Sequence, residues 1–298
     1  MKVFLNKKEL DENHFMDNEN ILCFAKEEQA NQILEMLQLE HLHISESSGS
    51  RFESRNGFDY ISLSVPDKND IMAPPGKVEI YFTSGKLLFF HNKVPVIHSV
   101  IEKIMEKRKE IQSLGKALYL FFYKLTENDA GFLEKIEEEI ADLEDSLANG
   151  KQLEYPSEIS LLRKRLLVLK RYYEGLNDLL EDLEENQNNL LEGEDIRTFR
   201  LQTNRAERLY RSVLNLRDYV TQVREAYQSQ VDISLNKTMQ FFTVITTIFL
   251  PLTLLVGWYG MNFHMPEYEM DYAYPIVIIV SAFVVVGSIL YFKKNKWF

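Results

Sequence analysis

Residues 257–263 read GWYGMNF, and they combine a conformationally free glycine with a neutral side-chain oxygen. Gly260 lets the backbone turn and expose its carbonyl groups, and Asn262 offers an amide oxygen next to them. Neutral oxygens suit a cation that keeps its water, and Mg²⁺ gives up its hydration shell reluctantly. In a ring of identical chains, one such asparagine per chain would form a collar at the mouth of a pore. The ordinary alternative for these residues is a helix end followed by a turn.

A stripe of polar and small residues precedes this loop at helical spacing. Steps of three and four residues place the following positions on one face of a helix: Asn236, Met239, Thr243, Thr246, Leu250, Thr253 and Gly257. Hydroxyl groups in a membrane helix often bond to carbonyls of their own helix, which is the ordinary explanation for the threonines. The apolar stretch that follows has only Ser281 and Ser288. A stripe on one stretch and not on its neighbour favours a helix that lines water, inside a closed ring of identical chains.

Two uncharged apolar stretches of membrane length lie near the C-terminus. FFTVITTIFLPLTLLVGW lies within residues 238–266, and PIVIIVSAFVVVGSILYF lies within residues 272–292. A helix of about 20 apolar residues crosses the ~30 Å hydrocarbon core of a bilayer. The two stretches therefore predict a membrane hairpin rather than two helices of a buried core.

Flanking charges predict the orientation of this hairpin. Lysines lie on the two outer flanks, at Lys237, Lys293, Lys294 and Lys296. The connecting loop has no Lys or Arg but contains Glu267, Glu269 and Asp271. Positive residues stay on the cytoplasmic side, so both termini are expected in the cytoplasm and the acidic loop outside. The first residues contain no apolar core of a cleavable signal peptide.

The remainder of the chain predicts a cytoplasmic α/β domain and a helical stalk. Over residues 1–110, strands are expected at Ile21–Ala25, Phe58–Val65, Val78–Phe82 and Leu87–Phe90, and helices at Glu27–Leu39 and Pro95–Lys107. Apolar residues then recur at helical spacing over residues 132–147 and 162–183. From Ile196 no Pro or Gly occurs before Pro251, which predicts a helix of about 60 residues and ~90 Å that enters the membrane.

Composition excludes several functional classes. The 298 residues carry a net charge of -11, from 45 acidic and 34 basic residues, which argues against a nucleic-acid binder. Cys23 is the only cysteine, so a disulfide framework and a clustered-cysteine metal site are excluded. No phosphate-binding loop and no catalytic constellation stands out. The pair His41 and His43 is expected in a surface loop. Most acids of residues 132–194 are expected to be solvated or paired with the basic stalk, and a minority to bind hydrated divalent cations.

The sequence YGMNF directly after the first of two C-terminal spans, followed by MPE, a second span and a lysine-rich end, resembles the CorA family of magnesium transporters. The resemblance implies a homopentamer with a funnel-shaped cytoplasmic part and a pore lined by the first span. It also implies that Gly260, Met261 and Asn262 form the selectivity filter. Relatives that transport zinc often replace the methionine, so Gly-Met-Asn favours Mg²⁺.

Further site residues follow from the stripe and the resemblance together. The expected pore-lining residues are Asn236, Met239, Phe242, Thr243, Thr246, Leu250 and Thr253. Phe242 and Leu250 differ in size or shape from the residues common at these positions, but they keep the expected gate apolar. The resemblance places Glu225 at an acidic ring of the stalk, as a candidate metal contact. Asn262 is expected to contact the ion through its hydration shell.

These observations predict a channel of the plasma or inner membrane that admits Mg²⁺ passively, closes at high cytoplasmic Mg²⁺ and needs no organic cofactor. Alternatives are a related transporter for Co²⁺, Ni²⁺ or Zn²⁺, a membrane-anchored coiled-coil scaffold without a pore, and an enzyme anchored by a hairpin. The expected segments are an α/β domain (1–110), acidic helices (111–195), a stalk helix (196–237), a pore-lining membrane helix (238–258), an external loop with the filter (259–274), a second membrane helix (275–292) and a basic tail (293–298).

Overall fold

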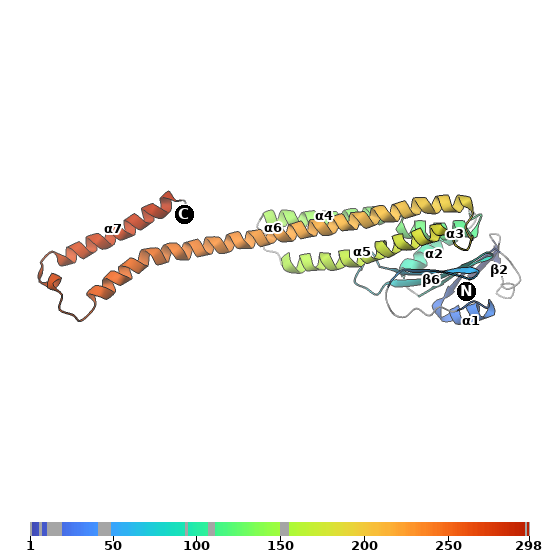
Figure 1. The fold of residues 1–298 in the computed structure, drawn as a ribbon, viewed down its shortest axis with the longest axis horizontal. Helices are drawn as coiled ribbons and strands as arrows, with labels where there is room; N and C mark the ends of the chain where they lie inside the picture. The colour runs from blue at the N-terminus through green and yellow to red at the C-terminus, as the bar shows by residue number, and fades with distance from the viewer. Residues whose placement is uncertain are drawn as a thin grey trace. The chain divides into compact units, whose positions relative to one another are not determined.

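The computed structural model describes residues 2–5, 8–10, 20–40, 49–92, 95–106, 111–149, 155–295 and 297. The pair His41 and His43 and the tail residue Lys296 lie outside these residues. The chain divides into two compact units, Met1–Arg224 and Glu225–Phe298, and Figure 1 shows the elements of each. The finer division of the chain into functional segments, given above from the sequence, stays a prediction.

The first unit contains a seven-stranded sheet. The strand order is β2 (Lys8–Leu10), β1 (Lys2–Leu5), β3 (Ile21–Lys26), β7 (Lys86–His91), β6 (Gly76–Thr83), β5 (Phe58–Val65) and β4 (Arg51–Arg55). β3 and β7 are parallel, and the other neighbouring strands are antiparallel. The turn between β6 and β7 is held by Thr83, whose hydroxyl accepts a hydrogen bond from the Lys86 backbone N–H at 2.9 Å.

Helices cover both faces of the sheet, which explains why its central strands are apolar without alternation. On one face, the short helix η2 (Glu27–Gln29) leads into α1 (Ala30–Met36), and Ile33 and Leu34 pack on Cys23 and Tyr81. On the other face lie α2 (Pro95–Glu106) and α3 (Leu114–Thr126), and the rings of Phe89 and Phe121 have centroids 5.1 Å apart. The predicted α/β domain is confirmed.

Three long helices follow, α4 (Asp129–Ala148), α5 (Tyr155–Glu185) and the first part of α6 (Gly193–Tyr259). Each buries an apolar stripe at steps of three and four residues, as in Ile136 and Ile140 of α4. Polar contacts join the helices at their edges. Tyr219 of α6 donates a hydrogen bond to Glu144 of α4 at 2.6 Å, and Arg165 of α5 pairs with Glu139 of α4. These contacts account for part of the charge segregation in the sequence.

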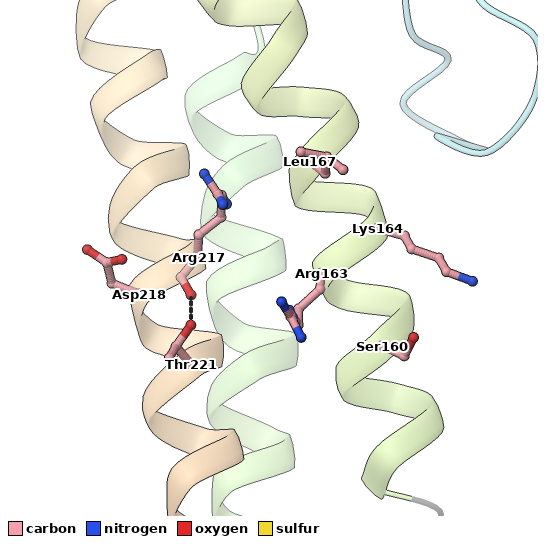
Figure 2. Close-up of a pocket in the computed structure, with 7 residues that line it drawn as sticks. All are labelled: Ser160, Arg163, Lys164, Leu167, Arg217, Asp218 and Thr221. Atoms are coloured by element: carbon pink, nitrogen blue, oxygen red, sulfur yellow. Dashed lines mark hydrogen bonds between the residues drawn. The ribbon is translucent and has the colours of Figure 1, made fainter.

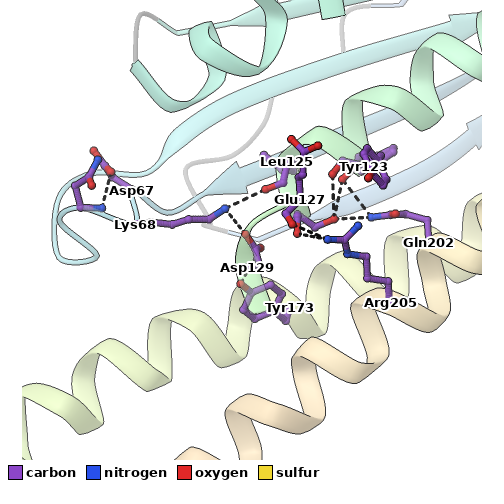
Figure 3. Close-up of polar contacts among 12 residues, drawn as sticks. Asp67, Lys68, Tyr123, Leu125, Glu127, Asp129, Tyr173, Gln202 and Arg205 are labelled. Carbon is purple, nitrogen blue, oxygen red and sulfur yellow. Dashed lines mark hydrogen bonds and ion pairs between the residues drawn. The ribbon is translucent and has the colours of Figure 1, made fainter. Parts of the chain in front are cut away.

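The turn between α3 and α4 is a junction of four segments of the first unit, shown in Figure 3. Asp129 is fully buried. One of its carboxylate oxygens forms an ion pair with Lys68, which comes from the loop between β5 and β6. The other oxygen accepts a hydrogen bond from Tyr173 of α5 at 2.8 Å. Lys68 also donates to the Leu125 carbonyl at 3.1 Å, so it ties the loop to the end of α3.

Side chains of α6 bond to further carbonyl groups at this end of α3. Arg205 donates to the carbonyls of Thr126 and Glu127 at 2.9 and 2.8 Å. Gln202 donates to the Thr126 hydroxyl at 2.7 Å and to the Phe122 carbonyl at 3.2 Å. Because the last carbonyls of a helix have no partner within it, these bonds fix the end of α3 on α6 (Figure 3).

The second unit consists of α6 from Glu225 onward, the short helix η4 (Pro266–Glu269) and α7 (Ala273–Lys294). α6 and α7 are long and apolar enough to cross a membrane, with mean hydropathies of 2.0 and 2.5 in their most apolar windows. The long helix expected from Ile196 is confirmed, and it begins slightly earlier, at Gly193. It also continues through Pro251 to Tyr259.

Candidate functional site

The polar stripe of α6 lies on the face of the helix that points away from α7. A groove between the two helices is lined by Phe241, Val244, Ile245 and Ile248 of α6 and by Ile289 and Lys293 of α7. At 100° per residue, Val244 and Ile248 are about half a turn away from the stripe. Within this chain, Val244 is 3% exposed, whereas Met239 on the stripe is 58% exposed. The stripe therefore belongs to the surface of α6 that α7 leaves uncovered, and it is the polar part of that surface.

All the pore-lining residues expected from the sequence are exposed on α6. They are Asn236, Met239, Phe242, Thr243, Thr246, Leu250 and Thr253. Phe242 borders the stripe rather than lying at its centre, and its ring contacts that of Phe241 edge to face at 5.8 Å. The helix thus brings the predicted residues together along one open face.

The threonine hydroxyls of the stripe donate their protons to their own helix. Thr243, Thr246 and Thr253 bond to the carbonyls four residues earlier, each at 2.8 Å. This is the ordinary arrangement anticipated for membrane threonines. It has a chemical consequence, because a hydroxyl that has used its proton still carries lone pairs. Such oxygens offer acceptors, and not donors, to whatever occupies the open face.

The stripe continues toward the N-terminal side of α6 with two carboxylates. Asp232 and Glu225 lie seven and fourteen residues before Met239, and both are exposed. Seven residues make almost two helical turns, so both acids share the face of the stripe. Glu225 was expected from the resemblance, whereas Asp232 was not expected. The spacing of the stripe, extended backward from Met239, reaches Asp232.

The loop that follows α6 begins with a closed last helical turn and then exposes the residues expected to form the filter. The Gly260 N–H donates to the Val256 carbonyl at 2.8 Å, which closes the last turn. A Cβ atom at Gly260 would lie only 2.9 Å from that carbonyl oxygen, so a glycine is required here. Met261 and Asn262 are exposed beyond it. The acidic residues Glu267 and Glu269 lie on η4, and Asp271 follows; all three are exposed.

A cation site complete within one chain is not found among the described residues, where no three His, Cys, Asp or Glu side chains are grouped closely enough to hold a metal. Near the C-terminal end of α5, burial and then the charge of Glu181 raise the pKa of Asp178. Burial and then Glu185 raise the pKa of Asp182. These carboxylates repel one another in the absence of a counter-ion. A site at Glu225 or Asn262 would need the same residue from other copies.

A pocket between α5 and α6 is lined mainly by basic side chains, in contrast to the carboxylates near the end of α5 (Figure 2). Its volume is about 310 Å³, and its charged lining residues are Arg163, Lys164 and Arg217 with the single acid Asp218. Thr221, at its edge, donates to the Arg217 carbonyl at 3.0 Å. The excess of positive charge makes this pocket unsuitable for a divalent cation.

Comparisons with solved structures match nearly the whole chain. The structure of the CorA magnesium transporter from Methanocaldococcus jannaschii superimposes with a TM-score of 0.81 and 23% identity, over 98% of this chain and 95% of that one. The full-length CmaX protein gives a TM-score of 0.73 with 14% identity, over 99% and 97% of the two chains. At these identities the likeness shows the fold: an α/β unit, a long helix and two apolar C-terminal helices.

Sequence comparisons give the family. The "Cobalt/magnesium transport protein CorA" of Thermotoga maritima is 29% identical over 244 residues, which are 80% of this chain and 70% of that protein. The "Magnesium transport protein CorA" of Haemophilus influenzae is 28% identical over 284 residues, 88% of this chain and 83% of that protein. The family model described as "CorA-like Mg2+ transporter protein" matches residues 24–294. The chain therefore belongs to the CorA family of Mg²⁺ transporter proteins.

Proposed function

We propose that the chain forms a homopentameric channel that admits hydrated Mg²⁺ into the cytoplasm down its electrochemical gradient. The observation that carries this proposal is the direction of the α6 stripe. Its polar face points away from α7, is exposed, and ends at the Gly260-Met261-Asn262 loop. Identical copies arranged around this face would enclose a water-lined path, with α7 on the outside against lipid.

The chemistry of the face suits a cation that retains its water. Water molecules bound to Mg²⁺ direct their oxygen atoms inward and their hydrogen atoms outward, so a hydrated ion presents hydrogen-bond donors. Thr243, Thr246 and Thr253 offer acceptors because their protons are bonded to the helix. The Asn262 side-chain oxygens and the loop carbonyls would supply the first such acceptors at the outer mouth. Mg²⁺ dehydrates reluctantly, so a pathway that does not strip its water matches it.

We place the gate at the apolar residues Met239 and Phe242, near the cytoplasmic end of the membrane part of α6. Both are large and more than half exposed on the open face or its border. Apolar side chains brought together from several copies form a constriction that excludes water, which closes a pore by dewetting. The Asn236 side chains would form a polar ring just below this constriction.

The orientation proposed from flanking lysines puts the acidic loop outside and both termini in the cytoplasm. Glu267, Glu269 and Asp271 are exposed there and would raise the local concentration of cations at the entrance. The membrane would be the plasma or inner membrane. The negative interior of the cell then drives the cation inward.

Cytoplasmic Mg²⁺ is the proposed regulator of this channel. In a ring, the Glu225 and Asp232 side chains of different copies would face one another and repel. A divalent cation between them removes this repulsion and favours a closed, symmetric ring. A ligand that binds the closed state more tightly shifts the population toward it, so high cytoplasmic Mg²⁺ would stop influx. The repelling carboxylates near Asp178 and Asp182 would add to this response.

Related divalent ions are the second candidate substrates. The Thermotoga maritima relative is named for both cobalt and magnesium. The sequence also leaves Ni²⁺ and Zn²⁺ open as transported ions. The Gly-Met-Asn loop favours Mg²⁺. A pore-free scaffold would leave the open polar face of α6 without a purpose.

Uptake of Mg²⁺ into proteoliposomes tests the proposal. The purified chain should give Mg²⁺ flux, and Asn262→Ala should abolish it while the oligomer stays intact by size-exclusion chromatography. Asn295→Ala removes the same side chain at the C-terminal end of α7 and should leave the flux unchanged. Normal flux in the Asn262→Ala protein would refute the filter assignment, and no flux with the unaltered chain would favour the scaffold.

A further inference from the structure

We propose that the groove between α6 and α7 binds one anionic phospholipid per chain, with the lipid phosphate at Lys237 and Lys293 and an acyl chain along the groove. The proposal uses the membrane placement of the proposed function, but it concerns the face of α6 opposite to the ion pathway. It assigns a role to residues that the transport mechanism leaves unused.

The groove has the chemistry of an acyl-chain site. Its volume is about 470 Å³, and five of its six lining residues are apolar: Phe241, Val244, Ile245, Ile248 and Ile289. Phe241 is more than half exposed although it lies in the most apolar part of the helix. The two helices therefore meet at Val244 and leave open apolar space on either side of this contact.

Two lysines from different helices border one end of this groove. Lys293 of α7 lines it directly. Lys237 lies four residues before Phe241 on α6, and residues four apart share a face of a helix. Lys237 is therefore on the groove side of α6, about one turn beyond the apolar lining. In the proposed site, one ligand at this end contacts both ammonium groups.

The positive charge at this end of the groove has no acidic counterpart on the membrane helices. The sequence contains no Asp or Glu from Ile233 to Pro266 or from Tyr272 to Phe298. The nearest acid on α6, Asp232, belongs to the opposite face, seven residues before Met239. These lysines therefore leave an uncompensated positive charge at this end of the groove, which attracts an anion.

The depth of the lysines identifies the anion as a lipid headgroup. Lys237 precedes Trp258 by 21 residues of continuous helix, or ~32 Å, which is about the thickness of the hydrocarbon core. Trp297, a residue type typical of the membrane interface, packs on Phe292 with ring centroids 5.3 Å apart. Both lysines therefore lie at the level of lipid phosphates, where basic pockets between membrane helices bind anionic lipids.

A second copy of the chain is a poorer occupant of the groove. The open polar face of α6 is the one that the proposed ring turns toward its other copies, and the groove is on the other side. A second copy also brings no carboxylate at this depth, because its own membrane helices lack acids. An anionic phospholipid fills the apolar groove with an acyl chain and neutralises the two lysines with its phosphate.

Native mass spectrometry of the full-length assembly tests this site. The detergent-purified protein is titrated with phosphatidylglycerol or with phosphatidylcholine. Phosphatidylglycerol should saturate at about one lipid per chain and bind more tightly than phosphatidylcholine. The double variant Lys237→Gln/Lys293→Gln should bind phosphatidylglycerol about 30-fold more weakly, and each single variant about 5-fold more weakly. Lys294→Gln removes the neighbouring charge, which does not line the groove, and should have little effect.

A second variant separates the groove from the charges. Ile289→Trp fills the apolar space and keeps both lysines, and it should also weaken phosphatidylglycerol binding. Equal binding of the two lipids, or an equal effect of Lys294→Gln and Lys293→Gln, would overturn the proposal. So would an Ile289→Trp protein that dissociates into single chains and loses no lipid, because a second copy would then occupy the groove. Mg²⁺ flux in the same variants is measured separately, so failure of the lipid site is distinguishable from failure of the channel.

Discussion

Replacing Lys68 by methionine should destabilise the first unit more than its position in a surface loop indicates. Lys68→Met keeps the apolar stem but removes the charge that pairs with Asp129. Asp129 is fully buried, and its second carboxylate oxygen accepts the bond from Tyr173 at 2.8 Å. A buried ion pair that loses one partner costs about 3–5 kcal/mol, because the remaining charge stays in a low-dielectric interior.

The reverse substitution should cost less. Asp129→Asn leaves the lysine unpaired instead, and the Lys68 side chain is 27% exposed and can be hydrated. The asparagine oxygen still accepts the bond from Tyr173, so a cost of about 1–3 kcal/mol is expected. The asymmetry follows from burial alone, since both variants break the same pair.

Hydrogen exchange of the full-length protein measures these costs locally, on peptides that cover α3 and α4. Lys68→Met should lower protection there by about 100- to 5,000-fold. Lys170→Met is the matched control, because Lys170 is 25% exposed and pairs with Glu174 at 2.6 Å, but Glu174 is 40% exposed. An exposed pair of this kind contributes about 1 kcal/mol or less. Equal losses in the two lysine variants, or a larger loss in Asp129→Asn than in Lys68→Met, would show that burial of Asp129 does not set the cost.

Four further predictions concern the sheet, the loop, the stripe and the topology. Burial and the charge of Glu27 raise the pKa of Glu79 to about 7 from 4.5, so the folded state binds more protons than the unfolded state between these values and stability falls as pH rises through them. Glu79→Gln should therefore stabilise the sheet by up to ~3 kcal/mol at pH 8 and by little at pH 4, measured by thermal unfolding; equal gains at both pH values would exclude this cause. Gly260→Ala should reduce Mg²⁺ flux at least ~10-fold, because its Cβ would meet the Val256 carbonyl at 2.9 Å; unchanged flux would show that the loop adapts. Asp232→Asn should weaken closure by cytoplasmic Mg²⁺, seen as less protection from proteolysis in millimolar Mg²⁺ than the unaltered chain shows, with monovalent salt of equal ionic strength as the control. Tyr268→Cys should react with an impermeant thiol reagent added outside; labelling only from the cytoplasmic side would reverse the proposed orientation.

Periodicity made the interior strands and the helices predictable. The strand expected at residues 58–65 is confirmed with the same bounds, and those expected at 78–82 and 87–90 are confirmed with small extensions. Their apolar runs are buried on both faces of the sheet. β1, β2 and β4 were missed, because short strands toward the edges of a sheet carry charged residues, as in Arg51–Arg55, and show no apolar run. The expected helix over residues 27–39 is shorter and divided, with a 3₁₀ turn before α1.

The candidate site was predictable to the extent that it lies on one helix. Helical spacing alone placed Met239, Thr246 and Leu250 on a common face, and the structure shows that face to be the one turned from α7. Which residues meet α7 depends on packing between two helices, and no local pattern encodes it. The junction of Lys68 with Asp129 was equally out of reach, because the two residues are 61 positions apart and meet only in the folded unit.

Thiol block of ion flux shows directly which face of α6 lines the ion pathway. Thr246→Cys places a cysteine on the stripe, and Ile248→Cys places one two residues further on, in the groove that faces α7. Cys23 is fully buried and can remain. Mg²⁺ uptake into proteoliposomes is measured before and after treatment with a small, positively charged thiol reagent, with the unaltered chain as the control. We expect the reagent to block flux through the Thr246→Cys protein and to leave the Ile248→Cys protein unaffected. Block of the Ile248→Cys protein alone would show that the ion pathway does not follow the stripe.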